Sequence, residues 1–360
     1  MAVPLFDPAT PLRPLRGELR AAVGRVLDRE QYILGDEVGA FEEEFSAYIG
    51  AREAVGVANG TEAITIALRA LGVGPGDDVV VPSFSFYASA EAIPVTGARP
   101  VFCDIDPDTM VVTPDTVKAA LTAKTKAVIA VHLFGNVAPV TEIEDLGVAV
   151  LEDAAQSAGS MAAGETRPGA LGTIATFSFY PSKNLGAFGD GGAVTTNDSA
   201  LAERVRVLRF HGSHDKVSYQ EIGYNSRLDE LQAAILRVQL PHLDAWADHR
   251  RAAGQWYADA GLGAHVKLPR PTTEARPAWH LFVARHDNAD PLIARLNAAG
   301  VQSRSYYRVP IHAQEAMAAY PPAVELPGTQ EAARTHLALP ISAAITRDQV
   351  DEVALAIANS

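Results

Sequence analysis

Residues 176–192 read Thr-Phe-Ser-Phe-Tyr-Pro-Ser-Lys-Asn-Leu-Gly-Ala-Phe-Gly-Asp-Gly-Gly, an apolar strand followed by a lysine in a turn and then by glycines. Most lysines lie in water, because burying a long charged amine is unfavourable. Lys183, however, follows a strand that ends at Ser178, and the glycines after it allow backbone to approach a ligand closely. A lysine that reacts with an aldehyde needs such a reachable position and surroundings that lower its pKa. The segment therefore indicates a reactive lysine at the end of a buried strand.

The chain around this lysine, from about residue 53 to residue 197, alternates short runs of β-branched apolar residues with longer amphipathic runs. This alternation is typical of an α/β domain with a mostly parallel sheet. We expect helices between several of the strands, at 61–71, 115–123 and 140–146. The expected strands are 54–58, 78–82, 99–104, 127–132, 148–153, 174–178 and 192–196.

Beyond residue 192 the pattern changes to long helical runs at 200–210 and 227–260, the second of them bent or broken at Pro241. These helices predict a bridge to a smaller α+β domain, with a strand at 279–285 and helices at 291–299 and 346–359. Three parts follow from this pattern: residues 1–25 as an N-terminal segment packing with the small domain, 26–245 as the large domain, and 246–360 as the small C-terminal domain.

The composition predicts a globular protein of a reducing compartment. With 360 residues, 48% of them hydrophobic, the chain can bury a large core. Its one cysteine, Cys103, excludes an intrachain disulfide and lies in an apolar run typical of core packing. The net charge of -13 argues against a nucleic-acid partner, since Lys and Arg neutralise phosphates. We expect no membrane partner and a cytoplasmic location, because neither a signal peptide nor a long apolar run is apparent.

A second candidate group lies at the end of the expected strand 148–153, which finishes with Glu152 and Asp153. Ligands of open α/β sheets bind at the carboxyl ends of strands, so an acid there faces a site. Asp153 could simply cap the next turn, or it could keep a pyridine nitrogen protonated. The two acids point to opposite faces of the strand and are not expected to chelate one ion. We predict no metal site, because the histidines near Asp215 lack an ordered ligand spacing.

A phosphate site is expected where a strand meets a helix at Gly60-Thr61. The free N–H groups of a helix N-terminus bind anions, and Ser178 could add a hydroxyl. Neither a dinucleotide fingerprint nor a Walker loop is present at this position, which favours the phosphate of a small cofactor. Several aromatic residues follow the strand at 78–82, and one of them could stack on a flat heteroaromatic ring.

Taken together, these residues resemble the DegT/DnrJ/EryC1/StrS family of sugar aminotransferases. The likeness covers nearly the whole chain, and such an ordered set of motifs is specific for the family. It implies fold type I, that of aspartate aminotransferase, with a mostly parallel central sheet and a smaller C-terminal α+β domain. The further motifs are Tyr-Ile-Leu-Gly at 32–35, His-Leu-Phe-Gly-Asn at 132–136, Gly-Tyr-Asn-Ser-Arg-Leu at 223–228, Pro-Ile-His at 310–312 and Leu-Ala-Leu-Pro at 337–340.

The resemblance implies pyridoxal 5′-phosphate as the cofactor. Lys183 would hold its aldehyde and shuttle protons, while Asp153 would pair with the pyridine nitrogen. Gln156 would lie against the ring near its hydroxyl, and Phe86 would stack on the other side. The enzyme would be a homodimer with shared active sites. The residues expected at the phosphate are Gly60, Thr61 and Ser178 of the same subunit, together with Asn225 of the partner subunit.

The same resemblance implies transfer of an amino group from an amino acid, L-glutamate, to a nucleotide-linked keto sugar. Family members that aminate C3 carry a segment similar to residues 179–192, so C3 is the expected position. The substrate residues implied are Arg227, Tyr306, Tyr307 and His312. Arg227 could instead form an ion pair at a surface or an interface, and His312 could be structural. Many relatives read His-Tyr-Pro where this chain has Tyr-Tyr-Arg at 306–308, which indicates different sugar or nucleotide contacts.

Two other functions are compatible with the same fold. One is a sugar dehydratase that depends on pyridoxal or pyridoxamine phosphate; those relatives replace the lysine with histidine, and Lys183 argues against this function. The other is a catalytically silent binding or regulatory protein. A visible absorbance band that disappears when an amino donor is added would distinguish the enzyme from the silent protein.

Overall fold

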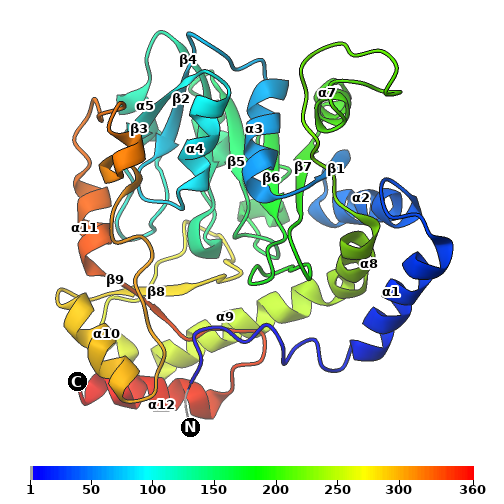
Figure 1. The fold of residues 1–360 in the computed structure, drawn as a ribbon. Coiled ribbons are helices and arrows are strands. Elements are labelled where there is room, and N and C mark those ends of the chain that lie inside the picture. The colour runs from blue at the N-terminus through cyan, green and yellow to red at the C-terminus, as the bar shows by residue number, and fades with distance from the viewer. Residues whose placement is uncertain (1–2) are drawn as a thin grey trace.

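A seven-stranded sheet forms the centre of the computed structural model, which describes residues 3–360 (Figure 1). Along the sheet the strands run in the order β1-β7-β6-β5-β4-β2-β3, and only β7 is antiparallel to its neighbours. The mostly parallel sheet expected from the sequence is thus confirmed. The strands are β1 (Glu53–Val57), β2 (Asp78–Pro82), β3 (Arg99–Cys103), β4 (Thr125–Val131), β5 (Ala149–Asp153), β6 (Ile174–Ser178) and β7 (Gly192–Thr196).

Alternate side chains of each strand point to opposite faces of the sheet, so both faces carry apolar side chains. Helices cover both faces. On β6, for example, Ile174 joins the core under α3 and α7, whereas Phe177 packs with Phe41 and Phe45 of α2. Each face therefore has its own apolar core. The helices of this part are α2 (Asp36–Ile49), α3 (Gly60–Ala70), α4 (Ala88–Val95), α5 (Pro114–Ala120), α6 (Val140–Glu144), α7 (Ser199–Arg209) and α8 (Glu230–Gln239).

The long helical run predicted at 227–260 is two helices. Asp229 caps α8 by accepting a hydrogen bond from the Gln232 N–H, so residues 227–229 precede the helix. A short 3-10 turn, Leu240–His242, separates α8 from α9 (Leu243–Asp259) at the expected proline. The domain boundary expected near residue 245 falls inside α9, which is continuous there. The division into domains therefore stays a prediction.

The C-terminal part pairs two antiparallel strands, β8 (Phe282–Arg285) and β9 (His336–Leu339). β8 begins three residues later than expected; Trp279 has a positive φ of 40°, which a strand does not accommodate. No pattern in the sequence indicated β9. The helices of this part are α10 (Ala289–Ala298), α11 (Pro327–Thr335) and α12 (Arg347–Ala358).

The N-terminal segment is divided between two neighbours. Val3 forms a bridge with Val301, and the Leu5 N–H donates to the side chain of Gln302. Helix α1 (Arg16–Arg29) packs instead against α8, where Leu19 meets Ile235. Within residues 3–360, no helix has both the length and the apolar character needed to cross a membrane.

Candidate active site

The expected lysine and acid lie at the same edge of the sheet. Neighbouring strands β5 and β6 are parallel, with Asp153 opposite Thr176, so both strands present their carboxyl ends at this edge. Asp153 is the last residue of β5 and is 6% exposed. Lys183 lies five residues beyond the end of β6, in a turn in which its N–H donates to the Tyr180 carbonyl. The sheet therefore places an acid and an amine beside one another at the ends of two strands.

Two hydrogen bonds fix the carboxylate of Asp153. The Ser89 hydroxyl of α4 donates to Oδ2 at 2.7 Å, and the Ala155 N–H donates to Oδ1 at 3.2 Å. The second bond shows that Asp153 also caps the turn after β5. The bond from Ser89 orients the Asp153 carboxylate toward α4. Ser89 was not among the residues predicted from the sequence. Hydrogen bonds to a carboxylate stabilise its charged form.

Glu152 faces the other side of β5, as predicted, and is fully buried. Its carboxylate accepts bonds of 2.8–2.9 Å from the N–H groups of Gly169, Leu171 and Gly172. His132 donates from Nε2 at 2.9 Å; its Nδ1 accepts from the Ala138 N–H, which leaves the proton on Nε2. Glu152 thus anchors the segment before β6, and it does not join Asp153 in a ligand set. Within residues 3–360, no three His, Cys, Asp or Glu side chains are grouped so as to hold a metal ion.

The environment of Lys183 suits a reactive amine. Burial lowers the pKa of Lys183 to about 8, and the negative charge of Asp153 opposes part of that shift. At neutral pH a useful fraction of the amine is therefore unprotonated, whereas an exposed lysine has a pKa of about 10.4. The side chain of Asn184 holds the loop by donating to the carbonyls of Ala158 and Ala278.

An anion cradle lies between α3 and the end of β6. Gly60 opens the helix so close to the strand that an added Cβ would lie 2.7 Å from the Cβ of Ser178. Asn59 caps the helix by accepting from the Glu62 N–H, and the other N–H groups at a helix start have no partner within the helix and can bind an anion. The Thr61 hydroxyl has no hydrogen-bond partner within residues 3–360. Helix donors, Ser178 and Thr61 together suit a phosphate.

Aromatic side chains pack together beyond the carboxyl ends of β2 and β4. Phe86 is 52% exposed, and its ring centroid lies 6.0 Å from that of Tyr307. Tyr307 stacks on Phe134 with an interplanar angle of 10°. Its hydroxyl accepts a 3.2 Å bond from Gln156, whose side-chain oxygen accepts from the Phe134 N–H. Tyr307, predicted as a substrate residue, is thus tied to Gln156, a predicted cofactor residue, and Phe86 remains free to stack on a ring.

Three further predicted site residues, His312, Arg227 and Asn225, form no hydrogen bond with this group in the described chain. His312 is held by Ser83 through a 2.6 Å hydrogen bond, in a separate small cleft. Arg227 lies over the ring of Phe210, 5.9 Å from its centroid, on the connection from α7 to α8. Asn225 is exposed on the same connection. Among residues 3–360, neither of the last two contacts Lys183 or Asp153 of its own chain.

Tyr306 and the unpredicted His280 both lie near Phe6 of the N-terminal segment. The ring of Phe6 lies 6.5 Å from Tyr306 and 6.3 Å from His280. Burial drives the pKa of His280 well below its usual value, and the charges of Lys183 and Arg250 lower it further, so the imidazole is neutral. Its Nδ1 has no hydrogen-bond partner within the described chain. The sequence contains no motif that singles out this histidine.

The residues present fit pyridoxal phosphate. The site supplies an amine of lowered pKa for an aldehyde, a buried acid for a pyridine nitrogen, an exposed aromatic ring, and a helix N-terminus with hydroxyls for a phosphate. The model of the DegT/DnrJ/EryC1/StrS aminotransferase family matches residues 14–358. The chain belongs to this family.

Individual relatives agree over nearly the full length. The chain is 44% identical to the dTDP-3-amino-3,4,6-trideoxy-alpha-D-glucose transaminase of Streptomyces venezuelae, covering 96% of this chain and 93% of the relative. It is 42% identical to the pleiotropic regulatory protein of Geobacillus stearothermophilus, covering 99% and 98%. The crystal structure of S. venezuelae DesV in complex with a ketimine intermediate superimposes with a TM-score of 0.96 at 43% identity, covering 99% and 98%. Fold type I is therefore confirmed, and pyridoxal phosphate is the cofactor.

We predict that the amine of Lys183 in the cofactor-free protein titrates near pH 8. Its labelling by an amine-reactive reagent, followed by peptide mass spectrometry across pH, should show a midpoint there. The same lysine in urea-unfolded protein, with an expected midpoint of about 10.4, is the reference. In Asp153→Asn the midpoint should fall further, because the acid's charge raises the pKa of the lysine. Equal midpoints in folded and unfolded protein would contradict the burial of this amine.

Proposed function

We propose that this protein is a pyridoxal-phosphate aminotransferase that moves an amino group from L-glutamate to C3 of a nucleotide-linked keto sugar. The observation that carries the proposal is the Lys183 amine, its pKa lowered to about 8, beside the buried carboxylate of Asp153. An amine that is partly neutral at neutral pH can attack an aldehyde and accept a proton.

The proposed roles follow from the contacts of each residue. Asp153, held by Ser89, supplies the negative charge for the pyridine nitrogen. Phe86 would cover one face of the cofactor ring, and Gln156, which donates to the Tyr307 hydroxyl, would lie against the ring. The residues proposed at the phosphate are Gly60, Thr61 and Ser178.

Lys183 has two tasks in the proposed reaction. Its amine would hold the cofactor covalently in the resting enzyme. As a free amine of lowered pKa, Lys183 would also carry the proton that leaves the donor's α-carbon, and it would do the same for the sugar in the second half of the reaction. When bound, the cofactor supplies the conjugated ring that stores the electron pair released with this proton.

Two observations support a keto sugar as acceptor and C3 as the position. The S. venezuelae relative is named for an amino group at position 3 of a dTDP-linked sugar. Residues 179–192 also resemble the segment of family members that aminate C3. Tyr306, whose ring lies 6.5 Å from that of Phe6, is the proposed contact for the sugar.

Neither alternative function fits the site as well. A dehydratase of this fold would have histidine in place of Lys183. A silent regulatory protein would have no need of an amine whose pKa is lowered beside a fixed acid, although one relative carries a regulatory name. The combination of Lys183, Asp153 and Ser89 supports an enzyme.

We further propose a homodimer whose subunits share their active sites. The connection from α7 to α8 projects from the body of the subunit (Figure 1) and exposes Val217, Tyr219 and Ile222. Phe86 is also exposed. Exposed apolar side chains of this size are typical of an interface. Asn225 and Arg227, at the base of the connection, would reach the phosphate and the substrate of the other subunit.

The cytoplasmic location and the domain boundaries stay predictions.

The first test of the proposed function is Lys183→Ala. Turnover of L-glutamate and a nucleotide-linked 3-keto sugar should fall by at least about 10³-fold, because both the covalent link and the proton carrier are lost. Cofactor phosphate should still bind, since the cradle is intact. Lys126→Ala, at an exposed lysine of β4, is the matched control and should retain activity. Full turnover by Lys183→Ala would contradict the assignment.

The shared site predicts complementation between two inactive variants. One is Lys183→Ala; the other is Asn225→Ala combined with Arg227→Ala. Unfolded and refolded together, they should regain partial activity, because one of the two sites in each mixed dimer has all residues intact. If mass measurement confirms mixed dimers and the mixture stays inactive, these residues serve their own subunit.

A further inference from the structure

Residues 305–309 form a loop that lacks backbone–backbone hydrogen bonds. Just before it, the Arg304 carbonyl accepts from the Ala338 N–H, and just after it, the Ile311 N–H donates to the Ser83 carbonyl. Between these two bonds, no residue from 305 to 309 donates or accepts a backbone–backbone hydrogen bond within the described chain. The position of the loop therefore depends on its side chains.

The guanidinium of Arg308 ties this loop to two helices of the C-terminal part. Nη1 donates to the carbonyls of Ala333 and Arg334 in the last turn of α11, the second at 2.8 Å. Nη2 donates to the carboxylate of Asp290, in the first turn of α10, and to the hydroxyl of Ser305. Each of these two nitrogens carries two hydrogens, so all four are in use.

The contacts of Arg308 are strong for physical reasons. The last carbonyls of a helix have no partner within the helix and carry the negative end of its dipole, which a cation stabilises. The bond to Asp290 joins two charged groups, and such bonds are roughly twice as strong as neutral ones. The side chain of Arg308 is only 31% exposed, so water screens these contacts less than on an open surface. The guanidinium is thus a firm anchor for the loop.

Tyr307, one residue before this anchor, connects the loop with a proposed cofactor residue. Its ring stacks on Phe134, and its hydroxyl accepts from Gln156. A shift of the loop would therefore separate the tyrosine from Gln156.

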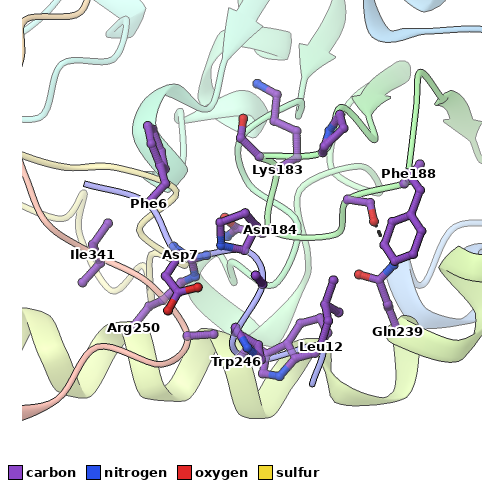
Figure 2. Close-up of a pocket in the computed structure, with 18 residues that line it drawn as sticks. Phe6, Asp7, Leu12, Lys183, Asn184, Phe188, Gln239, Trp246, Arg250 and Ile341 are labelled. Atoms are coloured by element: carbon purple, nitrogen blue, oxygen red, sulfur yellow. Dashed lines mark hydrogen bonds between the residues drawn. The ribbon is translucent and has the colours of Figure 1, made fainter. Parts of the chain in front are cut away.

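Tyr306 connects the loop with the surroundings of the reactive lysine. Its ring lies 6.5 Å from that of Phe6, and Phe6 lines the same cavity as Lys183 (Figure 2). A shift of the loop would therefore also move the side chain that is proposed to meet the sugar.

We propose that Arg308 is a positioning residue, which fixes Tyr306 and Tyr307 for the keto sugar. This inference rests on the proposed function. Both terminal nitrogens of Arg308 are occupied, so the residue acts through the two tyrosines and not through a terminal N–H of its own. Many relatives have proline at this position, and proline restricts the backbone without any contact. In this chain the contacts of a side chain take over that task.

Nitration of Tyr307 by tetranitromethane in the cofactor-free protein, read by peptide mass spectrometry, tests the positioning without catalysis. The reagent attacks the phenolate, and burial raises the pKa of Tyr307, so the wild-type residue should react slowly. In Arg308→Met the nitration rate should rise about 10-fold, the effect of removing a charge-assisted hydrogen bond from local closure.

Two further variants complete this experiment. Arg334→Met is the matched control, because the Arg334 side chain lies at the same end of α11 but pairs with Asp287 at 3.6 Å. It should react as wild type does. Asp290→Asn leaves Arg308 in place and removes its charged partner, so it should also raise the nitration rate. It decides the matter if Arg308→Met does not fold.

The two half-reactions, followed separately by the cofactor's absorbance, test the effect on the sugar. In Arg308→Met the sugar concentration that gives the half-maximal rate should rise about 10-fold, and the half-reaction with L-glutamate should change less than about twofold. A simple loss of folded enzyme would reduce both half-reactions by the same factor. Asp290→Asn should also raise the half-maximal sugar concentration, whereas a guanidinium that binds the nucleotide directly would bind it at least as tightly once freed from Asp290.

The possible contradictions are distinct. Wild-type nitration of Tyr307 in both Arg308→Met and Asp290→Asn overturns the inference and leaves the proposed function standing. Unchanged use of the sugar by both variants, in an enzyme that works, overturns it as well, and so does tighter sugar binding by Asp290→Asn. A wild-type protein that transfers no amino group from L-glutamate to any nucleotide-linked keto sugar overturns the proposed function, and the nitration rates alone then decide whether Arg308 fixes the loop.

Discussion

The electrostatic pairing of Lys183 with Asp153 is the interaction on which the site depends. Burial alone would lower the pKa of Lys183 below about 8, and the negative charge of Asp153 raises that pKa again in part. The amine is thereby kept near the point where both protonation states are populated at physiological pH, which a general base requires. The acid can act in this way because the parallel pairing of β5 with β6 presents both strand ends at one edge.

The surrounding structure serves largely to fix this pair. Glu152, one residue before Asp153, accepts three backbone N–H groups from the segment that leads into β6. Asn184, one residue after Lys183, ties the loop to two carbonyls of separate segments. Each residue of the pair thus has a buried polar neighbour that anchors its backbone. Such networks are stabilising when every group is satisfied, and the acceptor oxygen of Asn184 is an exception because it has no hydrogen-bond partner within residues 3–360.

The sequence was sufficient for features that depend on local pattern. The bounds of β2, β6 and β7 were predicted to the residue, since each is a short apolar run between turn signals. Lys183, Asp153 and Gly60 were found because strand ends in an α/β sheet are where ligands bind. The family resemblance then supplied roles that spacing alone left open.

The remainder depends on tertiary contacts that leave no local mark. Ser89 matters because α4 brings it within 2.7 Å of Asp153, 64 residues away in the chain. Arg308 reads in the sequence as a single charge in a loop, and its contacts with α10 and α11 appear only once the C-terminal part is folded. Tyr307 was assigned to the substrate from its motif, yet its hydroxyl meets Gln156. The late start of β8 comes from the backbone of Trp279, which no propensity predicts.

We propose that Lys183 is the residue that holds the cofactor. Borohydride reduction of the enzyme carrying pyridoxal phosphate, followed by digestion and peptide mass spectrometry, tests this claim directly. The account predicts a phosphopyridoxyl group on the peptide that contains Lys183 and on no other peptide in comparable yield. Stoichiometric modification of a different lysine, with Lys183 unmodified, would contradict it.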